Sequence, residues 1–294
     1  MIDLGGGRLD KLFTRLNALV DRLEAIYAAP QSSPAAAGTD WRAHAYRWQA
    51  GTLRPIERLH AIELDDLLHL QRQRAALEAN TRQFIAGLPC NNALLWGARG
   101  TGKSTLVKAL LNRYAGDGLR LVEVEAHALI DLPDVVAPLA GRAERFVLFV
   151  DDLSFDADDA SYRTLKAALD GSIAVAPDNV LIYATSNRRH LLPEQMEDNR
   201  AAQMVDGELH PGEAIEEKIS LSERFGVWLS FQPFSQDQYL AVVEHWLARL
   251  GGGELDDECR RAALQWALRR GNRSGRVANQ FARDWIGSQR LADD

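Results

Sequence analysis

A glycine-rich loop in the first half of the chain has the residue types needed to hold phosphate groups. Residues 97–104 read GARGTGKS and satisfy the pattern GxxxxGK[ST], between a predicted strand and a predicted helix. Its glycines let backbone N–H groups point inward at a helix N-terminus, where partial positive charge favours an anion. A chance glycine-rich turn is disfavoured because eight residues and both flanks agree. We expect these residues to contact a nucleotide: Gly97, Ala98, Arg99, Gly100, Thr101, Gly102, Lys103, Ser104 and Thr105.

Two side chains of this loop, and a pair of acids further along the chain, indicate phosphoryl chemistry. Lys103 is expected to reach the β- and γ-phosphates, and the Ser104 hydroxyl to ligate Mg²⁺. Residues 146–152, FVLFVDD, form an apolar run that ends in two carboxylates. Asp151 would hold Mg²⁺ through water, and Asp152 would polarise the attacking water. Aspartate is shorter than the more usual glutamate, so the alternative that Asp152 caps the next helix stays open.

A third strand end also carries polar side chains. Residues 180–187 read VLIYATSN, an apolar run that closes on Thr, Ser and Asn. The Asn187 amide could lie between the tips of the other two strands and orient a water near the γ-phosphate. Strand ends often carry Asn for reasons of turn geometry alone. The position of this strand directly after the acidic one favours the functional interpretation.

These residues need a scaffold of alternating strands and helices, and the hydrophobic periodicity predicts one. Short apolar runs at 93–96, 119–124, 146–150 and 180–184 alternate with helical patterns that begin at Lys103 and recur near Leu132 and Tyr162. A run at 227–231 could add a fifth strand. This alternation is typical of a parallel sheet covered by helices on both faces. A long helix is predicted over 64–86, and residues 236–250, 255–270 and 276–286 predict a small all-helical second domain.

The N-terminal part looks like an appendage. Apolar residues recur at helical spacing over 9–27, and the following residues, 28–38, are rich in Pro, Ser and Ala, as linkers are. This amphipathic helix could dock on the main body or pair with a protein partner, and the sequence does not separate these. An aromatic patch at Trp41, Tyr46 and Trp48 follows. We therefore divide the chain into residues 1–52, 53–232 and 233–294.

Composition excludes several classes of protein. The 294 residues are 46% hydrophobic and 26% charged, which is ordinary for a globular protein and unlike disordered, collagen-like or membrane chains. The net charge of −7 means that any nucleic-acid contact must come from a local basic patch. Cys90 and Cys259 lie far apart and outside any zinc-ligand spacing. With no signal-peptide pattern, we expect a cytoplasmic protein.

Taken in order, these motifs resemble the AAA+ ATPase superfamily. The order is a phosphate loop, an acidic strand end, a polar strand end, the segment SERF at 222–225, and a helical lid. The stretches 80–82, 95–104, 151–155, 184–191 and 273–276 more closely resemble a bacterial ATP-binding family, that of domain of unknown function 815. The resemblance covers about residues 53–285. It implies a five-stranded sheet in the order 5-1-4-3-2, with ATP bound between the sheet domain and the lid.

The resemblance also assigns arginines. Arg224 matches the arginine finger, which reaches the γ-phosphate of a neighbouring subunit and would make hydrolysis depend on assembly. The alternative is a surface arginine paired with Glu216, Glu217 or Glu223. Arg276 matches the sensor 2 arginine, which would couple the lid angle to the γ-phosphate. Arg273 is the substitute if the register is shifted.

These expectations combine into an ATP-binding AAA+ protein that hydrolyses ATP with Mg²⁺, as a homo-oligomer, to drive a conformational change in an unknown client or partner. One alternative is a nucleotide-gated binding module with little hydrolysis, which the aspartate at 152 permits. Another is a DNA-associated ATPase like initiators and helicase loaders, in which Arg188 and Arg189 contact phosphates. The motifs do not identify the client, and the acidic residues in 194–217 are expected to form a solvated loop and helix face or a partner contact.

Overall fold

The computed structural model describes residues 39–155, 160–169, 177–187, 203–205, 208–210 and 221–293. The helix expected over 9–27, the linker after it, and the residues Arg188, Arg189 and His190 lie outside these ranges. So does most of the acidic stretch, of which only the strands β7, Gln203–Val205, and β8, Glu208–His210, are described. These two strands pair in antiparallel fashion.

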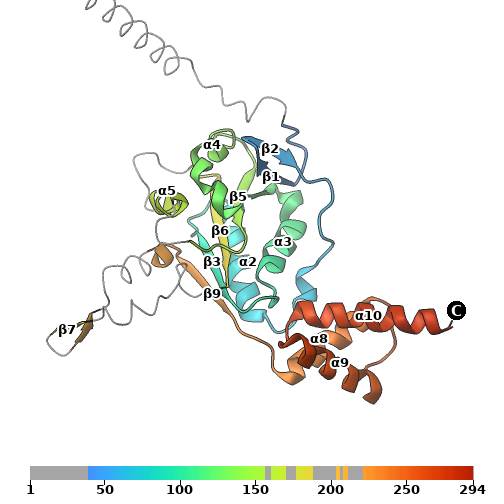
Figure 1. The fold of residues 1–294 in the computed structure, drawn as a ribbon. Coiled ribbons are helices and arrows are strands. Elements are labelled where there is room, and N and C mark those ends of the chain that lie inside the picture. The colour runs from blue at the N-terminus through green and yellow to red at the C-terminus, as the bar shows by residue number, and fades with distance from the viewer. Residues whose placement is uncertain are drawn as a thin grey trace, which may run out of the picture.

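A mostly parallel sheet forms the centre of the molecule (Figure 1). Its order is β2-β1-β4-β5-β6-β3-β9. The five strands β9, β3, β6, β5 and β4 are parallel and have the predicted order 5-1-4-3-2. Their bounds are β3 Ala93–Gly97, β4 Leu119–Glu123, β5 Arg145–Val150, β6 Val180–Ser186 and β9 Val227–Phe231. The predicted α/β class is therefore confirmed.

Two further strands correct the expectation of five. The strand β1, Ala45–Gln49, pairs in parallel with β4, and β2, Thr52–Pro55, pairs with β1 as a hairpin. Its two-residue turn, Ala50 and Gly51, has positive φ at both positions, as a tight hairpin requires. The side chains of Tyr46 and Trp48 are buried. Tyr46 and Trp48 of the aromatic patch thus form the inward face of β1, which lies between β2 at the edge and β4, and the sheet begins inside residues 1–52.

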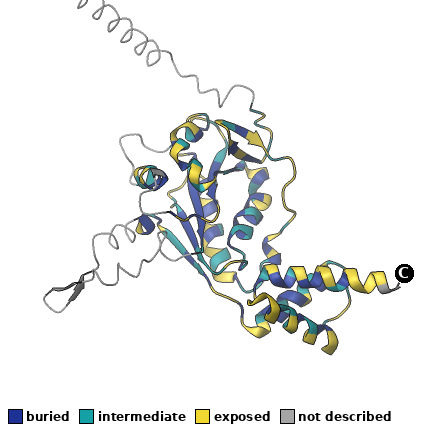
Figure 2. Ribbon diagram, in the orientation of Figure 1, coloured by how far each residue is buried: buried dark blue, intermediate teal, exposed yellow. Residues whose placement is uncertain are grey.

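Helices cover both faces of the sheet, as predicted. On β5, Val147 and Phe149 belong to the core shared with the helices α2 and α3. The alternate residues Phe146 and Leu148 belong to the core shared with α4 and α5, because successive side chains of a strand point to opposite faces. Figure 2 shows these strands as the most deeply buried part of the fold. The helices are α2 Gln71–Ile85, α3 Lys103–Tyr114, α4 Leu132–Val136 and α5 Ala160–Leu169.

The helix predicted over 64–86 is broken in two. A short 3₁₀ helix η1 spans Leu64–Asp66, and α2 begins only at Gln71. Between them His69 has φ of 60°, the left-handed conformation that ends a helix. Hydrophobic spacing did not predict the break because the leucines on both sides remain in helical register. Two more 3₁₀ turns, η2 Ala115–Asp117 and η3 Ala126–Asp131, complete the sheet domain.

Three helices form the predicted lid: α8 Gln236–Arg249, α9 Asp257–Arg270 and α10 Gly275–Asp293. Ser235 starts α8 with a capping box, accepting from the Gln238 N–H while the Gln238 side chain accepts from the Ser235 N–H. Gly271, with φ of 68°, ends α9. Within the described part of the chain, no helix combines the length and apolar character needed to cross a bilayer.

A buried ion cluster ties the lid to the segment before α2, and we call it the lid clasp. The Asp66 carboxylate is 1% exposed and accepts from a guanidinium nitrogen of Arg249. The Nε2 of His245 lies 3.1 Å from the same carboxylate oxygen. The Glu63 N–H donates to the other oxygen at 2.9 Å, and Arg249 lies 3.7 Å from the Glu63 carboxylate. The clasp joins η1 directly to α8.

Candidate nucleotide-binding site

The loop between β3 and α3 has the backbone geometry of a phosphate cradle. Gly97, Gly100 and Gly102 have φ of 133°, 76° and 105°, which other residues rarely adopt. A Cβ at Gly97 would collide with the Phe231 carbonyl, and one at Gly100 would lie 2.8 Å from the Ser274 hydroxyl. The loop is therefore held between β9 on one side and the lid on the other, and only glycine fits there.

Lys103 folds back into this loop. Its ammonium group donates to the Gly97 and Ala98 carbonyls, both at 2.8 Å, and to Asn187 Oδ1 at 3.1 Å. The side chain is 6% exposed. Burial lowers the pKa of Lys103, and the nearby charges of Arg276 and Arg99 lower it further, while Asp151 and Asp152 oppose the shift. A buried cation that bonds mainly to its own loop's carbonyls is well placed to receive an anion.

A second group of hydrogen bonds joins the loop to the ends of β5 and β6. The Ser104 hydroxyl donates to Asp151 Oδ1 at 2.5 Å, and the Thr185 hydroxyl donates to the same oxygen at 2.6 Å. The Asp152 N–H donates to the Thr185 hydroxyl at 2.9 Å. Thr185 is 1% exposed, whereas Asp151 is exposed. Thr185 thus holds the acidic turn in place from beneath.

Asp152 faces Asn187 and not a helix start. It has φ of 56°, which is uncommon for a residue with a side chain. The Asn187 amide donates to its carboxylate, and Arg99 lies 3.9 Å from the other oxygen. The helix α5 begins eight residues later, so Asp152 does not cap it. The structure therefore brings the predicted Lys103, Asp152 and Asn187 together in one connected group.

The lid contacts the loop through the start of α10. The Arg276 N–H donates to the Gly100 carbonyl at 3.2 Å. The positive charge of Arg276 also lowers the pKa of Lys103. Arg273, the substitute candidate, lies in the turn between α9 and α10, where its carbonyl accepts from the Phe234 N–H at 3.2 Å. Both arginines are exposed. Of these two arginines, Arg276 is the one whose backbone contacts the phosphate loop.

Arg224 lies at the opposite edge of the sheet. It precedes β9, whose last residue, Phe231, pairs with Gly97 at the phosphate loop. The four steps from Val227 to Phe231 cover about 13 Å at about 3.3 Å each, and Arg224 lies before them. Its backbone N–H donates to the Leu221 carbonyl at 3.3 Å, and the residue is half-buried. Arg224 is therefore not part of the site in its own chain.

Sequence reasoning missed two residues at the site. It assigned no separate function to Thr185, although a hydroxyl directly before two further polar residues at a strand end could have suggested one. Leu70 was also missed: a Cβ at Gly102 would lie 2.9 Å from its Cδ1, so Leu70 covers the start of α3. Nothing in the local pattern points to that contact. Leu70 connects the site to the lid clasp through four residues of chain.

The donor set at Asp151 fits Mg²⁺. The Ser104 hydroxyl and an exposed carboxylate are hard oxygen ligands, and Mg²⁺ in nucleotide sites takes one or two such ligands, with phosphates and waters completing its shell. Among the described residues no group of three or more His, Cys, Asp or Glu side chains could hold a metal by itself.

Residues 41–289 match the model of a family described as protein of unknown function (DUF815). That match covers most of the chain. The chain belongs to this family. The match begins at Trp41, before β1, so the added edge hairpin lies within the region that the family model covers. The family description itself assigns no activity.

Among curated proteins, the chain is similar to the 26S proteasome regulatory subunit 4 homolog of Schizosaccharomyces pombe, at 30% identity over 149 residues. The match covers 45% of this DUF815 protein and 33% of the relative. The chain thus spans only a third of that protein's length.

Solved structures show the fold. ORC1 from Aeropyrum pernix, solved in complex with DNA, matches with a TM-score of 0.54 at 16% identity, over 78% of this chain and 65% of that one. A point mutant of RuvB from Thermotoga maritima matches with a TM-score of 0.51 at 17% identity, over 75% and 64%. This DUF815 protein therefore has the AAA+ P-loop ATPase fold, and it spans just under two thirds of each of these chains.

Proposed function

We propose that this protein binds ATP with Mg²⁺ and hydrolyses it, using the lid as the part that moves. The observation that carries the proposal is the hydrogen-bonded group at the carboxyl edge of the sheet. There Lys103 contacts Asn187, Asn187 contacts Asp152, and Ser104 contacts Asp151. In phosphoryl transfer the protein acts mainly by positioning and by neutralising charge, and this group supplies residues for both.

The residues would share the work as follows. Lys103 would exchange its bonds to the loop carbonyls for bonds to the β- and γ-phosphates, which would place negative charge directly against a buried cation. Ser104 and Asp151 would hold Mg²⁺, which when bound neutralises developing charge on the phosphates. Asp152 and Asn187 orient the attacking water. Arg276, whose backbone already contacts Gly100, adds positive charge from the lid side.

Arg224 would act in a neighbouring copy. Its place at the amino end of β9 keeps it out of its own site, and a permanently charged planar fork is the group suited to reach a γ-phosphate across an interface. We therefore infer a homo-oligomer in which each site is completed by its neighbour. Hydrolysis then depends on assembly, and the lid transmits the nucleotide state to a client.

Steady-state phosphate release tests the enzyme. We expect Lys103→Ala to lower the rate at least about 100-fold, because a transition-state charge contact of this kind is lost. Lys108→Ala is the matched control, since Lys108 lies on the same helix and outside the site, and it should retain the wild-type rate. Equal rates for wild type and Lys103→Ala would overturn the proposal.

Mixing two inactive variants tests the action in trans. Arg224→Ala alone should be inactive although it still binds ATP, and Lys103→Ala supplies an intact Arg224 to its neighbour. A mixture of the two should therefore regain a measurable part of the wild-type rate. If each variant stays inactive in the mixture, and if the wild-type specific activity does not rise with protein concentration, Arg224 has no role in trans.

One observation favours a second function, a nucleotide-gated binding module that hardly hydrolyses ATP. Asp152 is already engaged by the Asn187 amide and has Arg99 nearby, so its carboxylate is less available to polarise a water. Tight ATP binding in the presence of Mg²⁺, without phosphate release above that of Lys103→Ala, would select this module over the enzyme.

A further inference from the structure

The lid carries a run of positive charge of which the proposed nucleotide site uses only Arg276. Residues 259–283 contain seven arginines and no Asp or Glu, although the whole chain has a net charge of −7. The segment spans the middle of the lid: most of α9, the turn after it and the first half of α10. We call these residues the arginine band: Arg260, Arg261, Arg269, Arg270, Arg273, Arg276 and Arg283.

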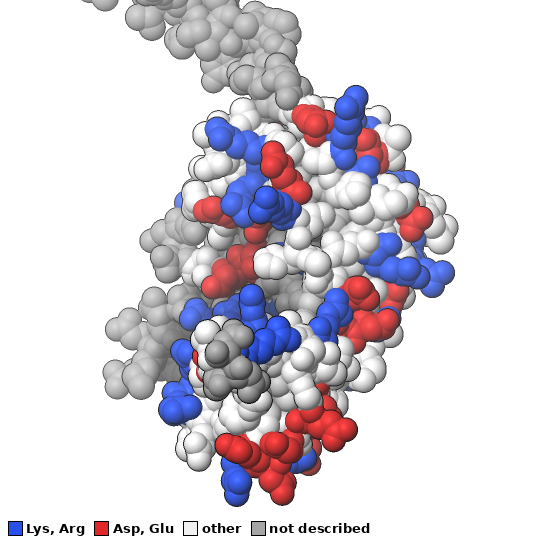
Figure 3. All heavy atoms as spheres, turned by 90° about the vertical axis from the view of Figure 1, so that its right-hand side faces the viewer, with Lys and Arg blue, Asp and Glu red and all other residues white. Residues whose placement is uncertain are grey.

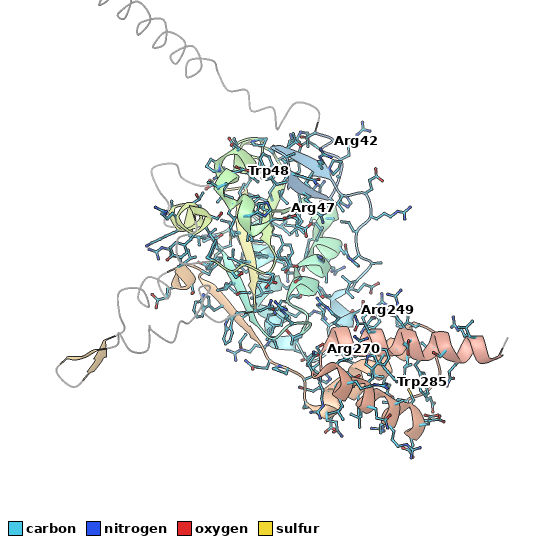
Figure 4. The ribbon with its side chains drawn as sticks, in the orientation of Figure 1. Arg42, Arg47, Trp48, Arg249, Arg270 and Trp285 are labelled. Carbon is cyan, nitrogen blue, oxygen red and sulfur yellow. The ribbon has the colours of Figure 1, made fainter. Side chains whose placement is uncertain are left out.

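All seven arginines of the band are exposed. In the part of the chain that the structure describes, none of their guanidinium groups forms an ion pair. Arg249 in the same lid is different, since the clasp pairs it with Asp66 and Glu63. Figure 4 labels Arg249 and Arg270, which lie on different parts of the lid. The charge of the band is therefore directed to solvent and is available to a ligand.

Four of the seven arginines lie near one turn of the chain. The turn between α9 and α10 is four residues long, from Gly271 to Ser274, so Arg269 and Arg270 before it, Arg273 within it and Arg276 after it lie near one another. Arg270 and Arg269 also lie over the ring of Trp266, with guanidinium carbons 5.1 Å and 5.9 Å from its centre. The three residues line a hollow of about 230 Å³. The indole Nε1–H of Trp266 is buried and has no acceptor among the described residues.

The chemistry of the band favours a polyanion over a protein surface. A stable protein interface needs an apolar centre, and Leu268 is the one large apolar side chain of 259–283 that is strongly exposed. Guanidinium groups instead match phosphate oxygens with paired hydrogen bonds. On the face shown in Figure 3, several basic side chains lie near the middle and several acidic ones at the lower end, and the two kinds lie side by side over much of the rest.

We propose that the arginine band binds the phosphate backbone of a nucleic acid, without reading its sequence. Contacts of this kind come from side chains that reach phosphates, and they do not distinguish bases. Since the rest of the molecule is acidic, the contact is confined to this part of the lid. The site is distinct from the tandem Arg188 and Arg189. It also includes Arg276, whose backbone contacts the phosphate loop, so a bound strand lies beside the part of the lid that meets the nucleotide.

A charge-matched pair of variants tests this. The triple variant Arg261→Gln, Arg269→Gln, Arg270→Gln removes three charges of the band and leaves Arg273 and Arg276 in place. The control is Arg42→Gln, Arg54→Gln, Arg58→Gln, which removes three exposed arginines from the β1–β2 region. Binding to a fluorescent single-stranded oligonucleotide and to its duplex is measured by anisotropy over a range of salt concentrations. Circular dichroism melting of each variant confirms that it folds.

We expect the control to bind like wild type and the band variant to bind about 100-fold more weakly at 0.1 M salt. The slope of log affinity against log salt should become shallower by about 2 for the single strand, since three phosphate contacts are lost. Equal loss in both triple variants would overturn the proposal. So would a failure of wild type to bind at low salt, or competition by polyglutamate as strong as by nucleic acid, which would indicate an acidic protein instead. A normal ATPase rate in the band variant separates this result from the proposed hydrolysis.

Discussion

The phosphate loop and the lid clasp both bring together charged side chains from distant parts of the chain. The short segment 63–70 connects them, because Glu63 and Asp66 belong to the clasp and Leu70 lies against Gly102 of the loop. In the clasp, Asp66 is buried and receives hydrogen bonds from the lid and from Glu63. At the loop, the buried cation Lys103 has carbonyl oxygens and an amide oxygen as its close partners, and the Asp151 carboxylate is exposed. The clasp pairs a buried carboxylate with cations, whereas the buried cation of the loop bonds to neutral oxygens, with the carboxylates of Asp151 and Asp152 nearby.

The difference distinguishes charge used for architecture from charge kept for a ligand. Positive φ at Asp152, the lowered pKa of Lys103 and three glycines that admit no side chain all occur at the loop. Such departures from relaxed geometry persist where surrounding structure imposes them, and they gather at functional sites. The clasp instead joins two elements about 180 residues apart in sequence and sets where the lid sits.

The largest effect is expected from breaking the clasp. Arg249→Met removes the main partner of Asp66 and leaves a buried carboxylate with His245, so the free energy of unfolding should fall by about 3 kcal/mol. The neighbouring acid provides the control: Asp65 is 83% exposed and pairs with Arg74 at 2.7 Å. Arg74→Met should cost less than about 1 kcal/mol, because exposed pairs contribute little. Urea denaturation measures both, and equal losses would contradict the distinction.

A smaller effect is expected beneath the acidic turn. Thr185→Val removes a buried hydroxyl that donates to Asp151 and accepts from the Asp152 N–H, which should cost about 2 kcal/mol of stability and also lower the ATPase rate. Thr185→Ser keeps the hydroxyl and loses only a methyl group, so its rate should stay near wild type. If Val and Ser lower the rate equally, Thr185 contributes packing and does not position the turn.

The strained backbone at Asp152 predicts a third effect. Unlike the two variants above, a substitution here that relieves the strain should not lower the free energy of unfolding. Asp152→Gly relieves a left-handed conformation that costs a residue with a side chain about 1–2 kcal/mol, and this offsets the greater freedom of glycine in the unfolded chain. We expect its unfolding free energy to be no lower than wild type, while phosphate release falls. Asp152→Ala keeps the strain and loses the carboxylate, so it should be about 1 kcal/mol less stable than Asp152→Gly. Urea denaturation of the two variants checks this, and a glycine variant less stable than the alanine one would contradict it.

Most of the sheet and the loop could be predicted because their signals are local. The parallel strands β3, β5 and β6 each contain an uninterrupted run of four or five apolar residues, and the residues GARGTGKS specify a turn geometry within eight positions. The order of the five strands came from the resemblance to a known superfamily. The strands β1 and β2 were missed because polar residues interrupt them and because their partner, β4, lies far along the chain.

The clasp and the broken helix could not be predicted from local pattern. Asp66 lies among residues that favour a helix, and its local sequence predicts an exposed acid. Its partners His245 and Arg249 come about 180 residues later in the sequence, after the whole sheet domain. Only tertiary packing makes that carboxylate buried. The same packing places His69 in a left-handed conformation, which is uncommon for a residue with a side chain, with its ring against Phe234 at the start of the lid.

The smallest effect concerns the protonation of Lys103. Its pKa is lowered by burial, so without nucleotide it loses its charge at a pH below the usual 10.5. Above its lowered pKa and below the ordinary value, the unfolded chain binds the extra proton, so this residue makes stability rise with pH in that interval. ATP affinity should change in the other direction, because the neutral amine no longer attracts phosphate, and binding must then take up a proton.

Isothermal titration in buffers of different ionisation heat measures that proton uptake. We expect wild type to take up protons on binding ATP at alkaline pH, in the interval between the lowered pKa of Lys103 and its ordinary value, while Lys103→Ala binds weakly with no uptake at any pH. Identical proton uptake by the two proteins would mean that the buried cation at the loop is as fully compensated as Arg249 in the clasp, and the contrast between the two clusters would be lost.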